Sequence, residues 1–137
     1  RDRSVSRGLG DVYKRQHLRR VGMVKDTIHT TELDTAYLRG RQLLEKRKYA
    51  QALYVLHDYR DRNTAIALLS LGQDREALRI LEALPATAIS EYLRAIACSR
   101  LGRKAEGRRH FLEACRRDER MEYRAALDPE IDELLKD

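Results

Sequence analysis

The sequence predicts an all-α fold of antiparallel helical hairpins, arranged as a repeat superhelix with a short C-terminal capping helix. The first observation is that a pair of small residues twelve positions apart occurs three times. The pairs are Gly40 with Ala52, Ala65 with Ala77, and Ala95 with Gly107. The second observation is that further residues follow at four and seven positions, namely Leu56 and Tyr59, Leu81 and Leu84, and Phe111 and Ala114. That spacing marks one helix face, and small residues let two helices cross closely, so each pair predicts a hairpin.

Residues 1–16 are expected to be an artefact without defined structure. The stretch from Ser6 to Gln16 resembles the in-frame translation of a transposase-based sequencing adapter. This interpretation predicts a metagenomic reading frame that runs into adapter sequence, and it leaves the true N-terminus, any signal peptide and any further domain open. The alternative is an ordinary basic, disordered tail.

The charge of the chain argues against a strongly basic domain. The formal net charge is +6, but residues 1–16 hold five basic and two acidic residues and therefore contribute +3 of it. The remaining +3 gives little attraction for nucleic acid or a membrane surface. No run approaches the roughly 18 apolar residues that span a bilayer. Cys98 and Cys115 match no zinc-ligand spacing, so we expect two buried thiols in a reducing compartment, and a cytoplasmic protein.

The chain divides into a linker over residues 17–32, a repeat domain of three hairpins over residues 33–118, and a C-terminal cap over residues 119–137. In the first hairpin, a helix is expected from about Asp34 to Glu45, with Asp34 capping its start. A turn leads to a second helix from about Tyr49 to Tyr59.

The second hairpin is bounded by cap and breaker residues. Asp61 or Asn63 is expected to cap its first helix, and Gly72 ends that helix in a left-handed conformation. Asp74 is expected to cap the next helix, and Pro85 ends the hairpin because proline cannot continue a helix interior.

The third hairpin and the cap carry the same kind of signals. Thr87 is expected to cap a helix of about Ala88 to Leu101, and a helix of about Lys104 to Arg117 follows. Asp128 and Pro129 then favour a short last helix that reaches about Leu135 and covers the third hairpin.

Residues 33–118 resemble the tetratricopeptide repeat family. The resemblance rests on the turn and second-helix openings at Leu71–Leu78, Leu101–Arg108 and Tyr49–Leu53, and on Phe111–Ala114 at the end of the third unit. The units repeat after 25 and 30 residues rather than 34, they have no tryptophan, and the closing prolines are missing. The resemblance therefore implies shortened hairpins, an irregular superhelix and a narrow binding groove.

The resemblance also implies a concave wall formed by the first helices of the hairpins. The residues expected on that wall are Tyr37, Arg41, Glu45, Arg62, Ile66, Tyr92, Ile96 and Arg100. Tyr and Arg concentrate binding energy at interfaces, and three arginines favour an acidic peptide or a terminal carboxylate. The alternative is that the two isoleucines and the tyrosines pack between repeats.

A second candidate surface is a basic helix face made by Lys104, Arg108 and Arg109. A phosphate-bearing partner could use it, but its basic residues are not interleaved with aromatic residues for stacking on bases, since the one phenylalanine of residues 103–120, Phe111, belongs to the predicted hairpin face. The alternative is a solvated face on which Glu113 pairs with neighbouring arginines. The four histidines are isolated in the sequence, so no metal ligand set, cofactor site or catalytic residue is expected.

The sequence thus predicts a non-catalytic scaffold that binds a protein or peptide, and it does not name the partner or the oligomeric state. One alternative is a nucleic-acid-associated helical module that uses residues 103–120. The other is a helical appendage of a larger enzyme that is truncated at the N-terminus.

Overall fold

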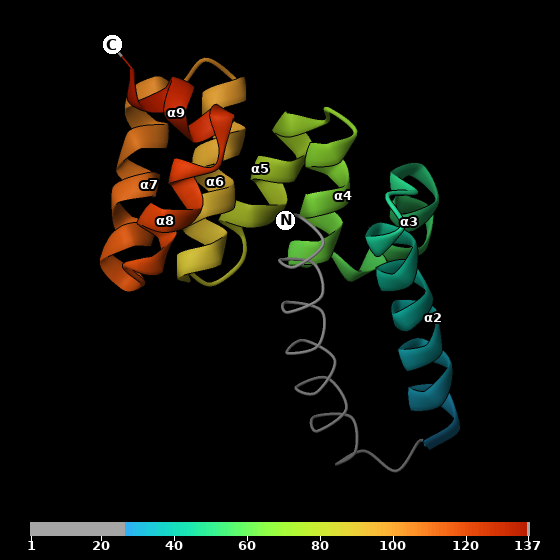
Figure 1. Ribbon diagram of the computed structural model, residues 1–137. Coiled ribbons are helices and arrows are strands. Elements are labelled where there is room, and N and C mark those ends of the chain that lie inside the picture. The colour runs from blue at the N-terminus through green and yellow to red at the C-terminus, as the bar shows by residue number, and fades with distance from the viewer. Residues whose placement is uncertain (1–26, 137) are drawn as a thin grey trace. The chain divides into compact units, whose positions relative to one another are not determined.

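The computed structural model describes the backbone of residues 27–136 and the side chains of residues 35–136. The described residues form an all-α structure of eight α-helices and one 3₁₀ helix (Figure 1). They divide into two compact units, with the boundary between Leu71 and Gly72. The adapter-like segment 1–16 and most of the expected linker lie outside the described residues.

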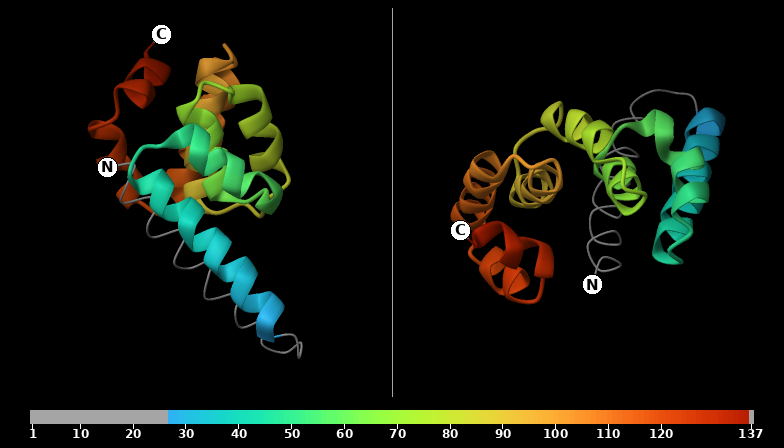
Figure 2. Two further views of the ribbon diagram at one scale, coloured as in Figure 1. Left: turned by 90° about the vertical axis from the view of Figure 1, so that its right-hand side faces the viewer. Right: turned by 90° about the horizontal axis from the view of Figure 1, so that it is seen from above.

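The first unit contains α2 (Thr27–Glu45), α3 (Tyr49–Leu56), a 3₁₀ turn (His57–Tyr59) and α4 (Arg62–Ser70). Helices α2 and α3 form the predicted first hairpin and lie side by side in all views (Figures 1 and 2). A Cβ atom added to Gly40 of α2 would lie only 2.6 Å from Leu56 Cδ2 of α3. The predicted small position therefore allows the two helices to approach closely, and Ala52 and Leu56 are fully buried beside it.

A buried polar network joins α2 to the start of α4. The Tyr37 hydroxyl donates to Asp61 Oδ2 at 2.8 Å and accepts from Asn63 Nδ2 at 2.5 Å. Asp61 caps α4, since its side chain accepts from the Thr64 backbone N–H at 3.0 Å. The Thr64 hydroxyl in turn donates to the Leu56 carbonyl at 2.7 Å, which closes the link to α3.

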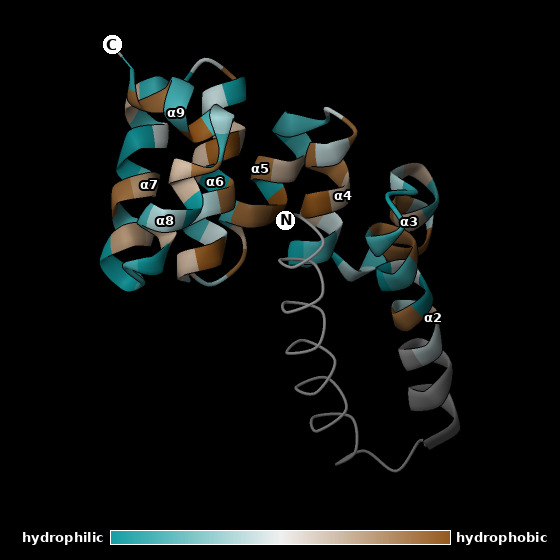
Figure 3. Ribbon diagram, in the orientation of Figure 1, coloured by the Kyte–Doolittle hydropathy of each residue, from teal (hydrophilic) through white to brown (hydrophobic). Residues whose placement is uncertain are grey.

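The second unit contains α5 (Asp74–Glu82), α6 (Ala88–Arg100), α7 (Lys104–Arg117), α8 (Arg120–Ala126) and α9 (Pro129–Leu135). Helices α6 and α7 form the predicted third hairpin, and hydrophilic and hydrophobic residues alternate in bands along α7 (Figure 3). A Cβ atom on Gly107 would lie 3.2 Å from the Ala95 carbonyl oxygen and 3.0 Å from Leu134 Cδ1. The small residues thus mark a close helix contact here as well.

Helices α8 and α9 cover the third hairpin, as the sequence predicts for the C-terminal segment. Ile131 and Leu134 are fully buried in one cluster with Tyr92, Ala95 and Phe111, among other residues of α6 and α7. The predicted cap of the last helix is confirmed, because Asp128 accepts from the Glu130 backbone N–H at 3.0 Å.

A buried arginine holds the end of α5 against α6. Arg94 is only 8 % exposed, and its guanidinium donates to the Leu81 carbonyl at 2.8 and 3.2 Å and to the Leu84 carbonyl at 2.8 Å. It also pairs with Glu91 at 3.4 Å. The last carbonyls of a helix have no partner within the helix. The Leu81 carbonyl accepts from the Leu84 backbone N–H at 3.1 Å, and Arg94 adds hydrogen bonds to this carbonyl and to that of Leu84 just beyond α5.

Three predictions about element boundaries are wrong. The first helix begins at Thr27 rather than near Asp34, so residues 27–32 are not part of a linker. Threonine lowers helix stability only slightly, whereas each residue added to an existing helix gains a hydrogen bond. Asp74 is the first residue of α5 and does not cap it, because its carboxylate accepts from Arg100 instead. The C-terminal segment has two helices, and α8 was not predicted.

The remaining boundary signals are confirmed. Thr87 caps α6 in a reciprocal arrangement with Ser90. Gly72 and Gly102 both have positive φ, at +78° and +79°, which is the left-handed conformation that ends α4 and α6 at little steric cost to glycine. The second expected hairpin would join α4 to α5, and these helices belong to different units.

Candidate functional site

Four of the residues predicted on the concave wall are buried in the described structure. Tyr37 and Tyr92 are 2 % and 4 % exposed, and Ile66 and Ile96 are 6 % and 9 % exposed. The Tyr92 hydroxyl donates to Asp128 Oδ2 at 2.7 Å, so this ring supports the contact between α6 and α9. The prediction that these four side chains face a partner is wrong, because neighbouring helices cover them.

The charged residues predicted on that wall take part in interactions within the chain. Arg100 pairs with Asp74 at 3.0 Å and with Glu130 at 2.6 Å, and the hydrogen bond to Glu130 raises the pKa of its guanidinium. Burial lowers the pKa of the half-buried Arg62. Arg41 and Glu45 are half-buried, and each also interacts with the rest of the chain.

The predicted basic face on α7 does not form as expected. Arg108 Nε donates to the Leu134 carbonyl at 2.9 Å, and its Nη2 donates to the Lys136 carbonyl. Lys104 also donates to that carbonyl, at 3.4 Å. These two side chains therefore complete the C-terminal end of α9, and Arg109 is exposed apart from them.

A different group of cations lines a small groove on the second unit, which we call the arginine groove. It has a volume of about 200 Å³ and is lined by Arg75, Leu78, Arg79, Glu82 and Arg103. Leu78 is 3 % exposed and forms an apolar floor, whereas the three arginines are exposed. Within residues 35–136, no hydrogen bond or ion pair engages any of the three guanidinium groups. The sequence analysis missed this groove because Arg103 lies between helices and far from the other two in the chain.

A second depression lies on the first unit, along α2 and α3. It has a volume of about 460 Å³ and is lined by Leu43, Tyr54, Val55 and their neighbours. Tyr54 is 90 % exposed. This depression is more apolar than the arginine groove, and among the described residues that line it only Arg39 is charged.

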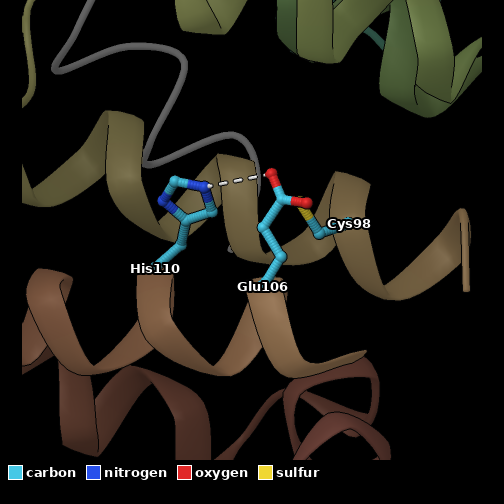
Figure 4. A group of neighbouring side chains, drawn as sticks. All are labelled: Cys98, Glu106 and His110. Carbon is cyan, nitrogen blue, oxygen red and sulfur yellow. Dashed lines mark ion pairs between the residues drawn. The ribbon is translucent and has the colours of Figure 1, made fainter. Parts of the chain in front are cut away.

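The structure also brings together three side chains that can ligate a metal. Cys98 of α6 faces Glu106 and His110 of α7 (Figure 4), and their ligand atoms all lie within 4.8 Å of one another. His110 Nδ1 lies 2.6 Å from Glu91 Oε1. His110, which is isolated from the other histidines in the sequence, thus has two acidic side chains and a thiol beside it in the structure. The spacing of residues in the sequence did not show this group, because Cys98 is on α6 and the other two residues are on α7.

The environment of Cys98 disfavours a thiolate. Burial, together with the negative charge of Glu106, raises the pKa of the Cys98 thiol to about 11. The thiol is therefore protonated at neutral pH when only protein groups surround it. The second cysteine, Cys115, is half-buried, and burial also raises its pKa.

Comparisons with protein-family models, with curated proteins and with solved structures find no match to the chain. The tetratricopeptide repeat resemblance thus remains a prediction from the residues. Across the described part of the chain, every helix is too short or too polar to cross a bilayer.

Proposed function

We propose that this protein is a non-catalytic helical module that binds an acidic peptide segment of another protein in the arginine groove. The observation that carries the proposal is the grouping of Arg75, Arg79 and Arg103 around the apolar floor at Leu78. Arginine guanidinium groups bind carboxylates through two parallel hydrogen bonds, and an apolar floor accommodates a hydrophobic side chain of the peptide. A glutamate-rich segment with one leucine fits this combination.

Other arginines of the chain are less suited to this role. Arg116 and Arg117 pair with Glu113 at 2.5 and 2.7 Å, and Arg120 pairs with Asp118 at 2.9 Å. These ion pairs already engage three of the cations that a nucleic-acid module over residues 103–120 would use for phosphate contacts, and Lys104 and Arg108 bond to the C-terminal end of α9. We therefore prefer a peptide partner over nucleic acid.

The test is a binding measurement by fluorescence anisotropy at low salt, with a labelled glutamate-rich peptide that contains a central leucine. The variant replaces Arg75, Arg79 and Arg103 with alanine. Each exposed ion pair contributes about 0.2–1 kcal/mol, so the triple variant is expected to bind roughly threefold to a hundredfold more weakly. A lysine-rich peptide of the same length should not bind.

A matched control removes the same positive charge elsewhere, by replacing Lys46, Lys48 and Arg109 with alanine. These three residues are exposed, and the control should bind almost as well as the parent. An equal loss of affinity in both variants would show that only net charge attracts the peptide and would overturn the proposal. So would absence of peptide binding by the parent, or tighter binding of single-stranded RNA than of the peptide.

A further inference from the structure

The contact between α6 and α7 creates a cluster of unlike ligand atoms at one place. Glu106 and His110 are four residues apart on α7 and so lie on the same helix face. Gly107 lies between them in sequence, and a Cβ atom there would be 3.3 Å from Cys98 Cβ. The absence of a side chain at Gly107 brings the α7 backbone close to α6, which places Cys98 beside the other two residues (Figure 4).

The spacing of the ligand atoms is close to what one metal ion requires. The three atoms lie within 4.8 Å of one another, and His110 Nε2 is 3.9 Å from Glu106 Oε2. Ligand atoms on a tetrahedral zinc ion are about 3.3–3.8 Å apart, given bond lengths of about 2.0–2.3 Å. Small rotations of the Glu106 and His110 side chains, which are 32 % and 23 % exposed, would close the difference.

A buried carboxylate orients the imidazole. Glu91 accepts the hydrogen bond from His110 Nδ1 at 2.6 Å, so in the neutral ring the lone pair is on Nε2, which lies on the side of Glu106. The Glu91 side chain is 8 % exposed and is itself held by Arg94 at 3.4 Å. Metal-bound histidines commonly donate their other ring nitrogen to a carboxylate in this way.

We propose that Cys98, Glu106 and His110 form a site for a zinc-like divalent transition metal, with Glu91 as the positioning residue for His110. Sulfur, nitrogen and oxygen donors suit Zn²⁺ and its substitute Co²⁺, whereas Mg²⁺ and Ca²⁺ require more oxygen ligands. On binding, the Cys98 S–H bond breaks, the metal–sulfur bond forms, and the proton leaves to solvent. The thiolate and the carboxylate then balance both charges of the ion.

Three protein ligands leave one tetrahedral position open for water or for a donor from another molecule. The site lies at the edge of the hairpin, with Cys98 fully buried on its inner side and the other two ligands partly exposed. An ion can therefore enter from solvent and cross-link α6 to α7. This site is separate from the arginine groove, and it does not depend on the function proposed for that groove.

The experiment is a Co²⁺ titration of the full chain, followed by absorption spectroscopy. The parent protein should show a sulfur-to-cobalt charge-transfer band that saturates at one ion per chain and disappears when Zn²⁺ is added. The charge-transfer band is the readout, rather than total metal uptake, because other histidines, such as the exposed His57, can also bind metal weakly.

Substitutions then test each assigned role. Cys98→Ala should abolish the band, and Glu106→Gln and His110→Ala should weaken Co²⁺ binding strongly. Glu91→Gln should weaken binding by about 10–100-fold, as is typical for residues that orient a ligand. The matched control is Cys115→Ala, which removes the thiol on α7 that is not part of the proposed site and should leave the band unchanged. Circular dichroism checks that each variant keeps its helical content.

The proposal is wrong if the parent shows no band at excess Co²⁺, or if the band survives in Cys98→Ala. It is also wrong if Glu106→Gln and His110→Ala bind Co²⁺ as tightly as the parent. These last two variants alter partly exposed side chains, so they keep the test informative even if the buried Cys98→Ala substitution unfolds the chain.

Discussion

Replacing Tyr37 with phenylalanine is expected to destabilise the protein by about 3 kcal/mol. The substitution removes only the hydroxyl group and leaves the buried ring in place. That hydroxyl donates to Asp61 Oδ2 at 2.8 Å and accepts from Asn63 Nδ2 at 2.5 Å. Asp61 and Asn63 are 7 % and 1 % exposed, so water has little access to the groups that would lose their partner.

The magnitude follows from the two hydrogen bonds that are lost. A hydrogen bond to a charged group contributes about 1.5–3 kcal/mol, and a buried donor left unsatisfied costs about 1–3 kcal/mol. The loss of stability at Asp61 should be near the lower end of this range, at about 1.5 kcal/mol, because the other carboxylate oxygen still accepts from the Thr64 backbone N–H at 3.0 Å. About 3 kcal/mol is therefore the expected total.

Urea denaturation followed by circular dichroism measures this difference. With a denaturant dependence of about 1–3 kcal/mol per molar urea, the midpoint should fall by roughly 1–3 M. Tyr54→Phe is the matched control, because Tyr54 is 90 % exposed in the same unit and its change should stay within about 0.5 kcal/mol. If the two variants unfold at the same urea concentration, Tyr37 has no structural role through its hydroxyl, and our reasoning about the network is refuted.

Two further predictions concern the helix contact in the first unit and the charges on α7. Gly40→Ala should lower the melting temperature. Overpacking against the buried Leu56 costs about 1–3 kcal/mol, which outweighs the roughly 1 kcal/mol that alanine adds to helix propensity. An unchanged or higher melting temperature would contradict the close approach of α2 and α3. Glu113 should titrate near pH 2 in an NMR experiment, because the hydrogen bond from Arg116 lowers its pKa from 4.5 to about 2. Since the folded-state pKa is the lower one, the stabilising contribution of Glu113 is present above pH 4.5 and is lost as the pH falls through about 2; a midpoint near 4.5 would show that the pair does not persist in solution.

The sequence was most informative where a structural signal is local. Gly102 ends α6 and Asp128 caps α9 as predicted, because the conformation of a cap depends on the few residues around it. The small residues at Gly40 and Gly107 also marked close helix contacts correctly. Their fixed spacing encodes the contact within one hairpin, so no knowledge of the rest of the chain was needed.

The candidate sites could not be predicted in the same way, because burial depends on residues far apart in the chain. Tyr92 was expected to face a partner, but it lies against α9 and bonds to Asp128, thirty-six residues later. Helix α8 was missed because its start has no signal like the Asp128–Pro129 pair of α9, and the carboxylate that accepts from its first N–H, that of Asp118, directly follows α7. Cys98 lies beside His110 only after α6 and α7 pack together, so no spacing of residues in the sequence indicates that cluster.

The guanidinium of Arg94 makes the stability of α5 depend on that of α6. Helix α5 has only nine residues, and a helix of that length frays readily when it stands alone. Unwinding its end here would remove the carbonyl partners of a buried cation, and only the ion pair with Glu91 would then compensate its desolvation. The amide protons in the last turn of α5 should therefore exchange with solvent as slowly as those in the middle of α6, so that the two helices open as one cooperative segment.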